Sequence, residues 1–373
     1  MRLGFACGWH HRPEKTWSGT PWHLRAALAQ SATVVDLGIR PPAAVQRALT
    51  LAYVRRSGHG WTSSWRYSRL WDAICQSLLA PRARRRGVDA VVQIQDLAFF
   101  DPPFYTYQDL SSDVVLSFLD QNGGRHPHFP MLDIGLVKRR RDRQHMLYER
   151  AAGVLAMSHW FARTLVELSG VPRHKVHVVY PGINVPVRND HLASQDIDLR
   201  SARLLFVGRD FISKGGDLVV RAARILQRDW PKVTLTVAGP KRWPSEAPPP
   251  EVVTFLGEVS PDRVAQLMLS HDVFVMPSRF EAFGIVFLEA LAHGLPCVAR
   301  NAYAMPEIVV PGKNGALVES EDPGELAEAI ALVLGNSELR IMCREEARNV
   351  VSGFSWEVSA RQLLKVVRGE AQG

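Results

Sequence analysis

Short apolar runs alternate along the chain with longer stretches in which apolar residues recur every three or four positions. The short runs fit strands that are buried on both faces, and the longer stretches fit helices that cover them. This alternation is typical of parallel α/β sheets. The strands that it predicts occupy residues 3–7, 33–37, 89–94, 153–157, 203–207, 233–238, 252–256, 273–276 and 296–299.

Helix signals follow most of these strands. Residues 21–30 begin with a Pro and place Leu24, Ala27 and Leu28 on one face, as a first helix would. Residues 101–130 carry an aromatic run and many turn-forming residues, and they fit neither pattern. In the second half, helices are expected over residues 216–228, 261–270, 282–293 and 323–334.

A length of 373 residues is enough for two domains, each with its own core. The polar segment from Pro186 to Ser201 shows no strong periodicity and is the expected linker. We therefore predict two α/β domains joined near residue 190, which cover residues 1–188 and 189–353.

Charge is divided unevenly between the two halves. Residues 1–185 hold 24 Lys and Arg against 13 Asp and Glu, whereas the rest of the chain holds 21 against 24. Two basic runs, Arg82–Arg86 and Lys138–Arg143, account for much of this excess. Two interpretations of these runs remain open. They are solvated helix faces and loop ends, or they attract an anionic partner, which would be a membrane surface or a phosphate-bearing acceptor.

Composition excludes several classes of protein. Hydrophobic residues at 46% and charged residues at 22% argue against wholesale disorder and fibrous architecture. No apolar run reaches the roughly 18 residues of a membrane span. The four cysteines are widely spaced and predict neither a disulfide framework nor a zinc site, so we expect reduced thiols in the cytoplasm; they are Cys7, Cys75, Cys297 and Cys343.

The most informative stretch runs from Met276 to Gly294. A predicted strand ends at Met276, a loop carries Glu281, and a helix is expected to open near Ala282. The first amides of a helix have no partner within it and can face an anion, here those near Phe283, Gly284 and Ile285. Glu289 follows Glu281 by eight residues, at most about 12 Å along a helix. A phosphate and two carboxylates that accept hydrogen bonds from sugar hydroxyls would fit this arrangement.

A second stretch places cations at the end of another strand. Arg209 and Lys214 lie around a turn in which Gly208 supplies backbone freedom, and a predicted helix follows. Two cations near a helix N-terminus suit a diphosphate. Open α/β sheets bind their ligands at the carboxyl ends of parallel strands, and both stretches lie at such ends.

With these residues in place, the second half resembles the nucleotide-sugar-binding domain of the retaining glycosyltransferases of family 4, which have the GT-B fold. The resemblance rests on the order and spacing of residues 206–215, 281–289, 290–296 and 306–315, and it continues more weakly at 156–160, 178–184 and 354–357. It implies two Rossmann-like domains that face each other across a cleft. It also implies a final helix, about residues 354–373, that crosses back to pack on the N-terminal domain.

The resemblance also implies roles for single residues. Arg209 and Lys214 would bind the diphosphate and stabilise its charge as it leaves, and Glu281 would contact the donor sugar. Glu289 would bind the ribose hydroxyls. Backbone contacts to the donor would come from Gly208, Phe283, Gly284 and Ile285. The resemblance implies neither a metal nor a cofactor, because cations and helix dipoles neutralise the charge.

The first half departs from the family pattern. Gly19 is the expected equivalent of a family Gly-Gly turn that touches the donor phosphates, and Asp109 and His23 are the candidates on the acceptor side. In the second half, Ala302–Met305 replaces a Gly-Gly before Pro306, so the identity of the sugar stays open.

The function expected from this resemblance is retaining, metal-independent transfer of a hexosyl group from a UDP- or GDP-sugar to a hydroxyl acceptor bound by the N-terminal domain. A glycan, a lipid-linked glycan and a natural product all remain open as acceptors. We expect a cytoplasmic protein, with peripheral attachment to the inner face of a membrane left open. Two alternatives also stand: a nucleotide-sugar epimerase on the same fold, and a basic nucleic-acid-binding protein. No nucleic-acid module is visible, and the basic runs lack interleaved aromatics.

Overall fold

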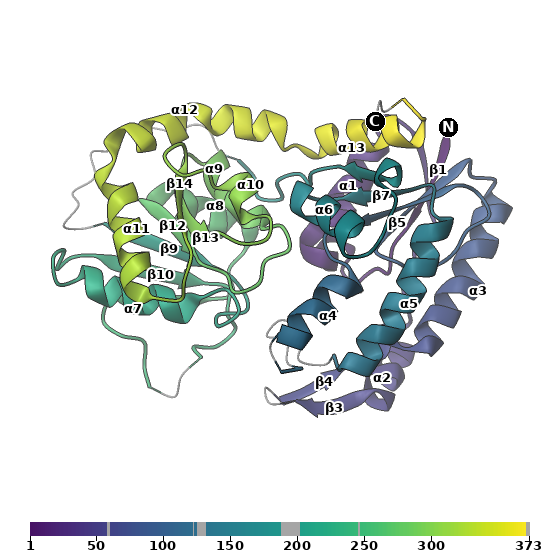
Figure 1. Ribbon diagram of the computed structural model, residues 1–373, viewed down its shortest axis with the longest axis horizontal. Helices are drawn as coiled ribbons and strands as arrows, with labels where there is room; N and C mark the ends of the chain where they lie inside the picture. The colour runs from purple at the N-terminus through teal and green to yellow at the C-terminus, as the bar shows by residue number, and fades with distance from the viewer. Residues whose placement is uncertain (58–59, 122, 125–131, 188–201, 245–246, 371–373) are drawn as a thin grey trace. The chain divides into compact units, whose positions relative to one another are not determined.

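The computed structural model describes residues 1–57, 60–121, 123–124, 132–187, 202–244 and 247–370 (Figure 1). The chain divides into two compact units, one of Met1–Gly182 with Trp356–Gly373 and the other of Ile183–Ser355. The domain boundary expected after residue 188, and most of the expected linker, lie outside the described residues.

The first unit is built on a parallel sheet. Its strands are β1 (Arg2–Ala6), β2 (Thr33–Asp36), β5 (Ala90–Ile94), β6 (Phe104–Gln108), β7 (Gly153–Ala156) and β8 (Val176–Val178), with β3 (Val54–Ser57) and β4 (Gly60–Ser63) as a separate antiparallel pair. The six strands lie in the order β2-β1-β5-β6-β7-β8. The inner strands β5 and β7 are buried along their whole length, which explains why they contain no polar side chain other than that of Gln93.

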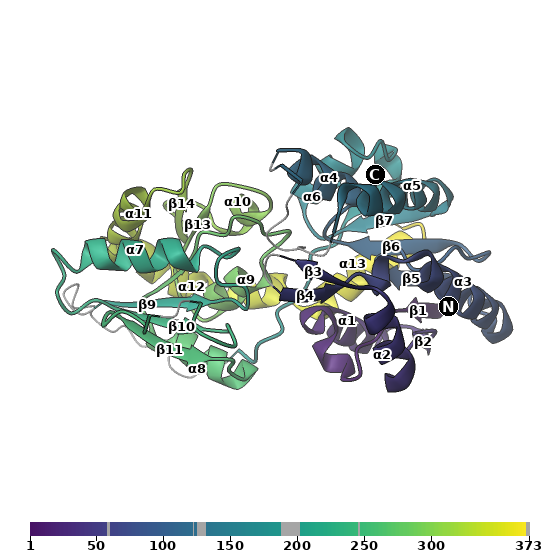
Figure 2. The same cartoon turned by 90° about the horizontal axis from the view of Figure 1, so that it is seen from below.

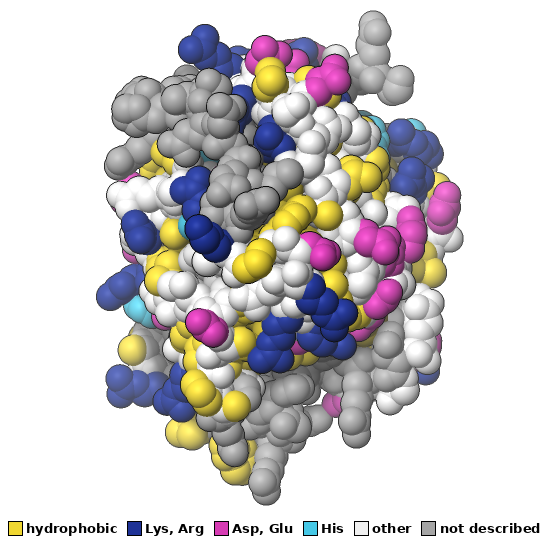
Figure 3. Space-filling view, turned by 90° about the vertical axis from the view of Figure 1, so that its left-hand side faces the viewer, with side chains coloured by type: hydrophobic (Ala, Val, Ile, Leu, Met, Phe, Trp, Pro, Cys, Tyr) yellow, Lys and Arg dark blue, Asp and Glu magenta, His cyan; other side chains and the backbone are white. Residues whose placement is uncertain are grey.

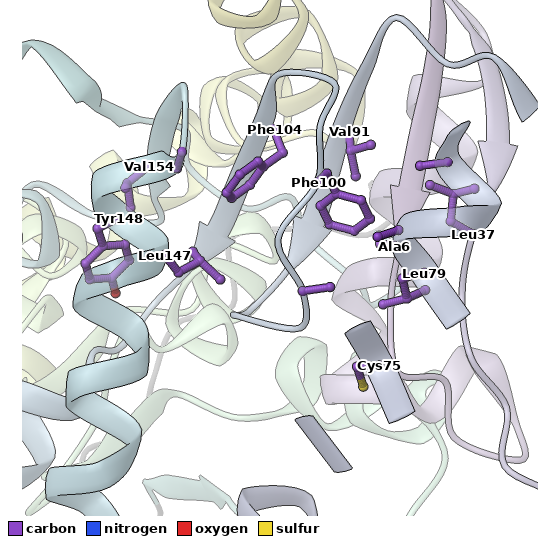
Figure 4. Close-up of a cluster of buried hydrophobic side chains, with 14 of the residues drawn as sticks. Ala6, Leu37, Cys75, Leu79, Val91, Phe100, Phe104, Leu147, Tyr148 and Val154 are labelled. Atoms are coloured by element: carbon purple, nitrogen blue, oxygen red, sulfur yellow. The ribbon is translucent and has the colours of Figure 1, made fainter. Parts of the chain in front are cut away.

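Helices cover this sheet and enclose the core. They are α1 (Thr20–Leu28), α2 (Ala43–Ala52), α3 (Arg69–Arg86), α4 (Ser112–Gln121), α5 (Ile134–Arg150), α6 (His159–Glu167) and α13 (Trp356–Val367). Leu79 of α3 and Leu147 of α5 pack with Val91 and Phe104 of the sheet (Figure 4). The final helix α13 packs on α1, as the resemblance implied, and the Ser359 hydroxyl donates a 2.6 Å hydrogen bond to the Tyr180 carbonyl.

The second unit repeats this plan. Its strands are β9 (Arg203–Val207), β10 (Thr234–Ala238), β11 (Val253–Gly257), β12 (Val273–Met276), β13 (Cys297–Arg300) and β14 (Gly315–Val318), and its helices are α7 (Gly216–Leu226), α8 (Pro261–Ser270), α9 (Ile285–Ala292), α10 (Met305–Ile308), α11 (Pro323–Gly335) and α12 (Ser337–Gly353). The six parallel strands lie in the order β11-β10-β9-β12-β13-β14. Figure 2 shows α7 and α11 on one side of this sheet and α8 on the other. The two Rossmann-like sheets confirm the predicted fold class.

Every predicted strand is present and shifted by at most one residue at either end. Sequence reasoning missed five strands: β6, whose aromatic residues stand in the unassigned stretch, the short pair β3 and β4, and the edge strands β8 and β14. The helix expected from residue 282 begins only at Ile285. Gly284 is its N-cap and has a φ of +93°, a left-handed conformation that ends the preceding loop.

Acidic and basic side chains lie close together on the face of the second unit in Figure 3, as the near balance of charge in this half of the sequence leads one to expect.

Candidate functional site

Two loops of the second unit meet at the carboxyl ends of β9 and β12, which are paired neighbours in the sheet. The first loop joins β9 to α7 and carries Arg209 and Lys214. Gly215 caps α7 with a φ of +75°, and a Cβ there would lie 2.5 Å from the Pro277 carbonyl oxygen. This close approach brings the first loop against the second, which begins at Pro277.

Lys214 and Glu281 form an ion pair across these loops. Lys214 Nζ lies 2.8 Å from Glu281 Oε2 and donates a 3.3 Å hydrogen bond to the Phe280 carbonyl. Their side chains are only 13% and 14% exposed, so neighbouring groups shield the pair from bulk water. Two residues chosen from separate motifs thus occupy one site, where a cation and a carboxylate hold each other in place.

The remaining donor-side residues are arranged around this pair. Arg209 is exposed, and the Gly208 backbone touches Gly239, where a Cβ would lie 2.8 Å from Gly208. Because α9 starts later than expected, its unpartnered first amides belong to Ile285 and Val286 rather than to Phe283. Phe283 itself is buried before the helix.

Sequence reasoning missed Arg279, which bridges the two loops. Its guanidinium donates to both Asp217 carboxylate oxygens, at 2.6 and 2.9 Å, and its Nε lies 3.0 Å from Glu321 Oε2. Nη1 also donates to the Ile212 carbonyl of the first loop. Burial raises the pKa of Asp217, but the hydrogen bonds from Arg279 outweigh burial, and the pKa lies below its ordinary value. The only sequence signal was an arginine two residues before Glu281.

Replacing Arg279 by Ala is expected to lower kcat/KM about tenfold, because the loops that carry Lys214 and Glu281 lose a common anchor. Arg279→Lys should not restore the rate, since an ammonium cannot make the two-pronged contact to Asp217. Steady-state kinetics, together with the melting temperature, provide the measurement.

Arg221→Ala is the matched control, because Arg221 also pairs with Asp217, at 3.2 Å, but is half exposed and belongs to α7 alone. Its rate should stay within about twofold of wild type. Equal losses in the Arg279 and Arg221 variants would mean that Arg279 does not position the loops.

Glu289 lies in α9, buried with 8% of its surface exposed. Burial raises the pKa of its carboxyl to about 7, although the backbone amides of Asn184 and Val185 donate to it and act in the opposite direction. The carboxylate therefore already has backbone partners in the segment that opens this unit.

This raised pKa predicts a pH-dependent stability. Since the unfolded Glu289 releases its proton near pH 4.5 and the folded one only near 7, the folded protein binds the extra proton and loses stability as the pH rises between these values. Glu289→Gln should remove up to about 3 kcal/mol of this loss. Urea unfolding at pH 5 and pH 8 measures it, with the exposed Glu338→Gln as control. An unchanged pH slope in Glu289→Gln would contradict the assignment.

Tyr303 stands where the family pattern has Gly-Gly. It keeps a left-handed φ of +56°, and its ring lies 5.1 Å from that of Phe280, next to Glu281. A non-glycine residue held in this conformation is strained, and such strain concentrates at functional sites.

The donor-side candidate Gly19 and the acceptor-side candidates His23 and Asp109 all lie in the first unit. Gly19, with a φ of +91°, caps α1 after two further left-handed residues, Trp17 and Ser18. His23 stacks on Trp356 at 6.3 Å, and burial lowers its pKa. Asp109 follows β6 and so stands at the carboxyl end of a strand.

The two basic runs differ in structure. In Lys138–Arg143, three arginines turn inward. Arg140 contacts Asp72 and Asp96, with its Nη2 at 2.6 Å from Asp96 Oδ1, and Arg139 and Arg143 also pair with Asp72. For these three arginines, the interpretations as a solvated helix face and as an anion-binding surface were both wrong. The run Arg82–Arg86 contains four arginines, and all four are exposed: Arg82, Arg84, Arg85 and Arg86. The hydrogen bond that the Arg82 guanidinium donates is exposed as well.

In the described parts of the chain, no group of three or more His, Cys, Asp and Glu residues is placed to hold a metal ion. Among the described helices, none combines the length and the apolar character needed to cross a membrane.

Comparison with known sequences gives a consistent result. Residues 187–350 match the sequence profile of a family described as glycosyl transferases group 1. A D-inositol 3-phosphate glycosyltransferase of Paenarthrobacter aurescens is 29% identical over 252 residues, which cover 63% of this chain and 62% of that relative. The chain thus matches less than two thirds of the length of this relative.

Comparison with solved structures shows the fold. The sucrose-phosphate synthase of Thermosynechococcus elongatus superposes with a TM-score of 0.71 at 19% identity, covering 99% of both chains. Anabaena HepE, solved in complex with UDP and glucose, superposes with a TM-score of 0.63 at 16% identity, covering 99% of this chain and all of its own. The predicted GT-B fold is confirmed.

Proposed function

We propose that this chain, whose residues 187–350 belong to the family of glycosyl transferases group 1, transfers a sugar from a nucleotide-diphosphate donor to a hydroxyl acceptor. The family match confirms the resemblance to family 4 that the sequence motifs indicated. The observation that carries the proposal is the Lys214–Glu281 pair at the carboxyl ends of β9 and β12, beside the N-terminus of α9.

The donor diphosphate would lie between Arg209, Lys214 and the first amides of α9. These groups supply positive charge where the leaving diphosphate gains negative charge, which is the condition for stabilising the transition state. No step in this scheme requires a metal, because the cations and the helix dipole face the diphosphate directly. Glu289 would accept hydrogen bonds from the ribose hydroxyls in exchange for its present backbone partners.

Transfer would retain the anomeric configuration. In the front-face mechanism, the departing phosphate oxygen accepts the proton of the attacking hydroxyl on the same face of the sugar. Glu281, held by Lys214, would contact the sugar near this face. In the first unit, Gly19 would touch the donor phosphates, and His23 and Asp109 would supply the acceptor side.

A uridine diphosphate donor is supported by the Anabaena neighbour, which was solved with UDP and glucose. A guanosine diphosphate donor is the second member of the class that we propose. Four free, buried cysteines in the described chain support a reducing compartment such as the cytoplasm. Of the two basic runs, Arg82–Arg86 is the better candidate for contact with an anionic surface, since the arginines at 139, 140 and 143 of the other run are paired within the unit.

The test is a panel of UDP-, GDP- and ADP-sugars incubated with the protein, with nucleotide release and sugar product as the readouts. One donor of the UDP or GDP class should be hydrolysed slowly without acceptor, and Glu281→Ala should abolish this. Absence of binding and turnover for the whole panel would overturn the proposal. An epimerised free nucleotide sugar would instead identify an epimerase.

A further inference from the structure

A cavity of about 510 Å³ lies in the first unit, at the carboxyl ends of β1 and β2. Its volume falls within the range of small-molecule sites. None of the donor- and acceptor-side residues proposed for this unit, Gly19, His23 and Asp109, lines it. The cavity therefore needs an explanation of its own.

Two helices build its apolar wall. Trp71, Ile74 and Leu78 of α3 recur at helical spacing and share one face, while Cys75 and Leu79 of the same helix point into the core (Figure 4). Val45 and Leu49 of α2 add a second apolar stripe. Leu78 and Val45 remain 40% and 44% exposed, so the cavity presents apolar surface to whatever enters it.

Two arginines of the lining are positively charged. Arg82 Nη1 donates a 3.1 Å hydrogen bond to the Gly38 carbonyl, and the Arg40 guanidinium lies 5.9 Å from the centre of the Trp9 ring. Among the described residues, no carboxylate lies within 4 Å of either guanidinium. Two cations without an anionic partner beside an apolar wall suit a ligand that carries an anion.

The single acidic group of the lining is already occupied. Asp36 Oδ1 accepts hydrogen bonds from the Gly38 amide at 2.8 Å and the Trp9 indole at 3.3 Å, and Oδ2 lies 3.6 Å from Arg25. Arg25 is not part of the lining, so it neutralises Asp36 from outside. The charge that faces the cavity is therefore mainly that of Arg40 and Arg82.

We propose that this cavity binds an amphiphile, whose apolar chain lies against α2 and α3 while its phosphate or carboxylate group pairs with Arg40 and Arg82. This assigns a location to the anionic partner that the basic charge of the first half suggested. The proposal does not depend on sugar transfer, because it concerns binding within the first unit.

The test measures binding of decyl phosphate to the full chain by isothermal titration below its critical micelle concentration. Decanol, which lacks the anion, and inorganic phosphate, which lacks the chain, should each bind at least about tenfold more weakly. Equal affinity for decyl phosphate and inorganic phosphate would overturn the role of the apolar wall, and equal affinity for decyl phosphate and decanol would overturn that of the arginines.

Variants locate the binding. Arg40→Ala removes a cation that holds no hydrogen bond in the described structure. Leu78→Asp places a negative charge, which repels the phosphate, at an exposed position of the apolar wall. Each variant should weaken decyl phosphate binding about tenfold. The controls are Arg85→Ala on α3 and Leu51→Asp on α2, because both residues lie outside the lining of the cavity. If all four variants bind like wild type, the cavity is not the site.

A vesicle arm separates the two sources of such a ligand. Sedimentation with phosphatidylglycerol vesicles that Arg40→Ala abolishes would support a bilayer lipid as the ligand. Decyl phosphate binding without sedimentation would support a dissolved amphiphile. The proposal would be overturned if the protein did not bind decyl phosphate and if the Arg40→Ala and Leu78→Asp variants still sedimented with the vesicles. General electrostatic attraction to the vesicle surface would then explain the sedimentation.

Discussion

Lys214→Ala is expected to lower kcat for sugar transfer by at least about a hundredfold, which corresponds to about 2.7 kcal/mol of transition-state stabilisation. The substitution removes the cation placed to neutralise the leaving diphosphate. It also removes the 2.8 Å partner of Glu281 and leaves a mostly buried carboxylate without its ion pair. The measurement is the initial rate of nucleotide release with the donor that the sugar panel identifies.

The matched control for this variant is Lys232→Ala. Lys232 is exposed just before β10, at the opposite end of the same sheet, so its loss should leave kcat within about twofold of wild type. A double-mutant cycle with Glu281→Ala adds a second criterion, because residues that act as a pair lose less together than the sum of their separate losses. Additive losses would show that the ion pair has no role in the reaction.

Much of this site could be predicted from sequence because its parts are local. Arg209, Lys214 and Glu281 each follow an apolar strand, and parallel strands place their carboxyl ends along one edge. The sequence could not establish that β9 and β12 are neighbours, since β9 precedes β10 and β11 in the chain. The structure shows this adjacency in the register of Val273 with Leu204.

The sequence did not show which charged residues pair when they stand far apart along the chain. Arg279 and Asp217 are 62 residues apart, and nothing local marks them as partners. The run Lys138–Arg143 appeared to be a cationic face because Asp72 and Asp96, which its arginines contact, stand 44 to 68 residues away. A charge pattern along one helix therefore cannot tell a solvated face from a buried network.

Backbone conformation was the other source of error. Residue 282 is Ala, the residue with the highest helix propensity, and it agrees with the helix start expected there. The left-handed Gly284 sets the true beginning at Ile285. At Tyr303 there was no signal in the sequence at all. This residue has a left-handed backbone although it is not a glycine, in the segment where the family pattern has Gly-Gly.

Gly284→Ala is accordingly expected to lower kcat/KM by about a hundredfold, although it adds only one methyl group. At a φ of +93° an alanine is strained, and its Cβ would lie 2.7 Å from Phe287 Cδ2 and 3.1 Å from Glu281 Cγ. Because Phe287 is fully buried, relief must come from a shift of the loop that carries Glu281. A displacement of about 1 Å at a catalytic group can cost two orders of magnitude.

Gly312→Ala separates the two effects that Gly284→Ala combines. Gly312 lies in the same unit at a φ of +75°, but a Cβ there meets nothing within 4 Å. It should therefore show the cost of the left-handed backbone alone, about 1–2 kcal/mol of stability, with kcat/KM near that of wild type. If both variants lose stability to the same extent and neither loses activity, the approach of Gly284 to Phe287 does not position Glu281. A loss of activity confined to Gly284→Ala would tie the helix start to catalysis.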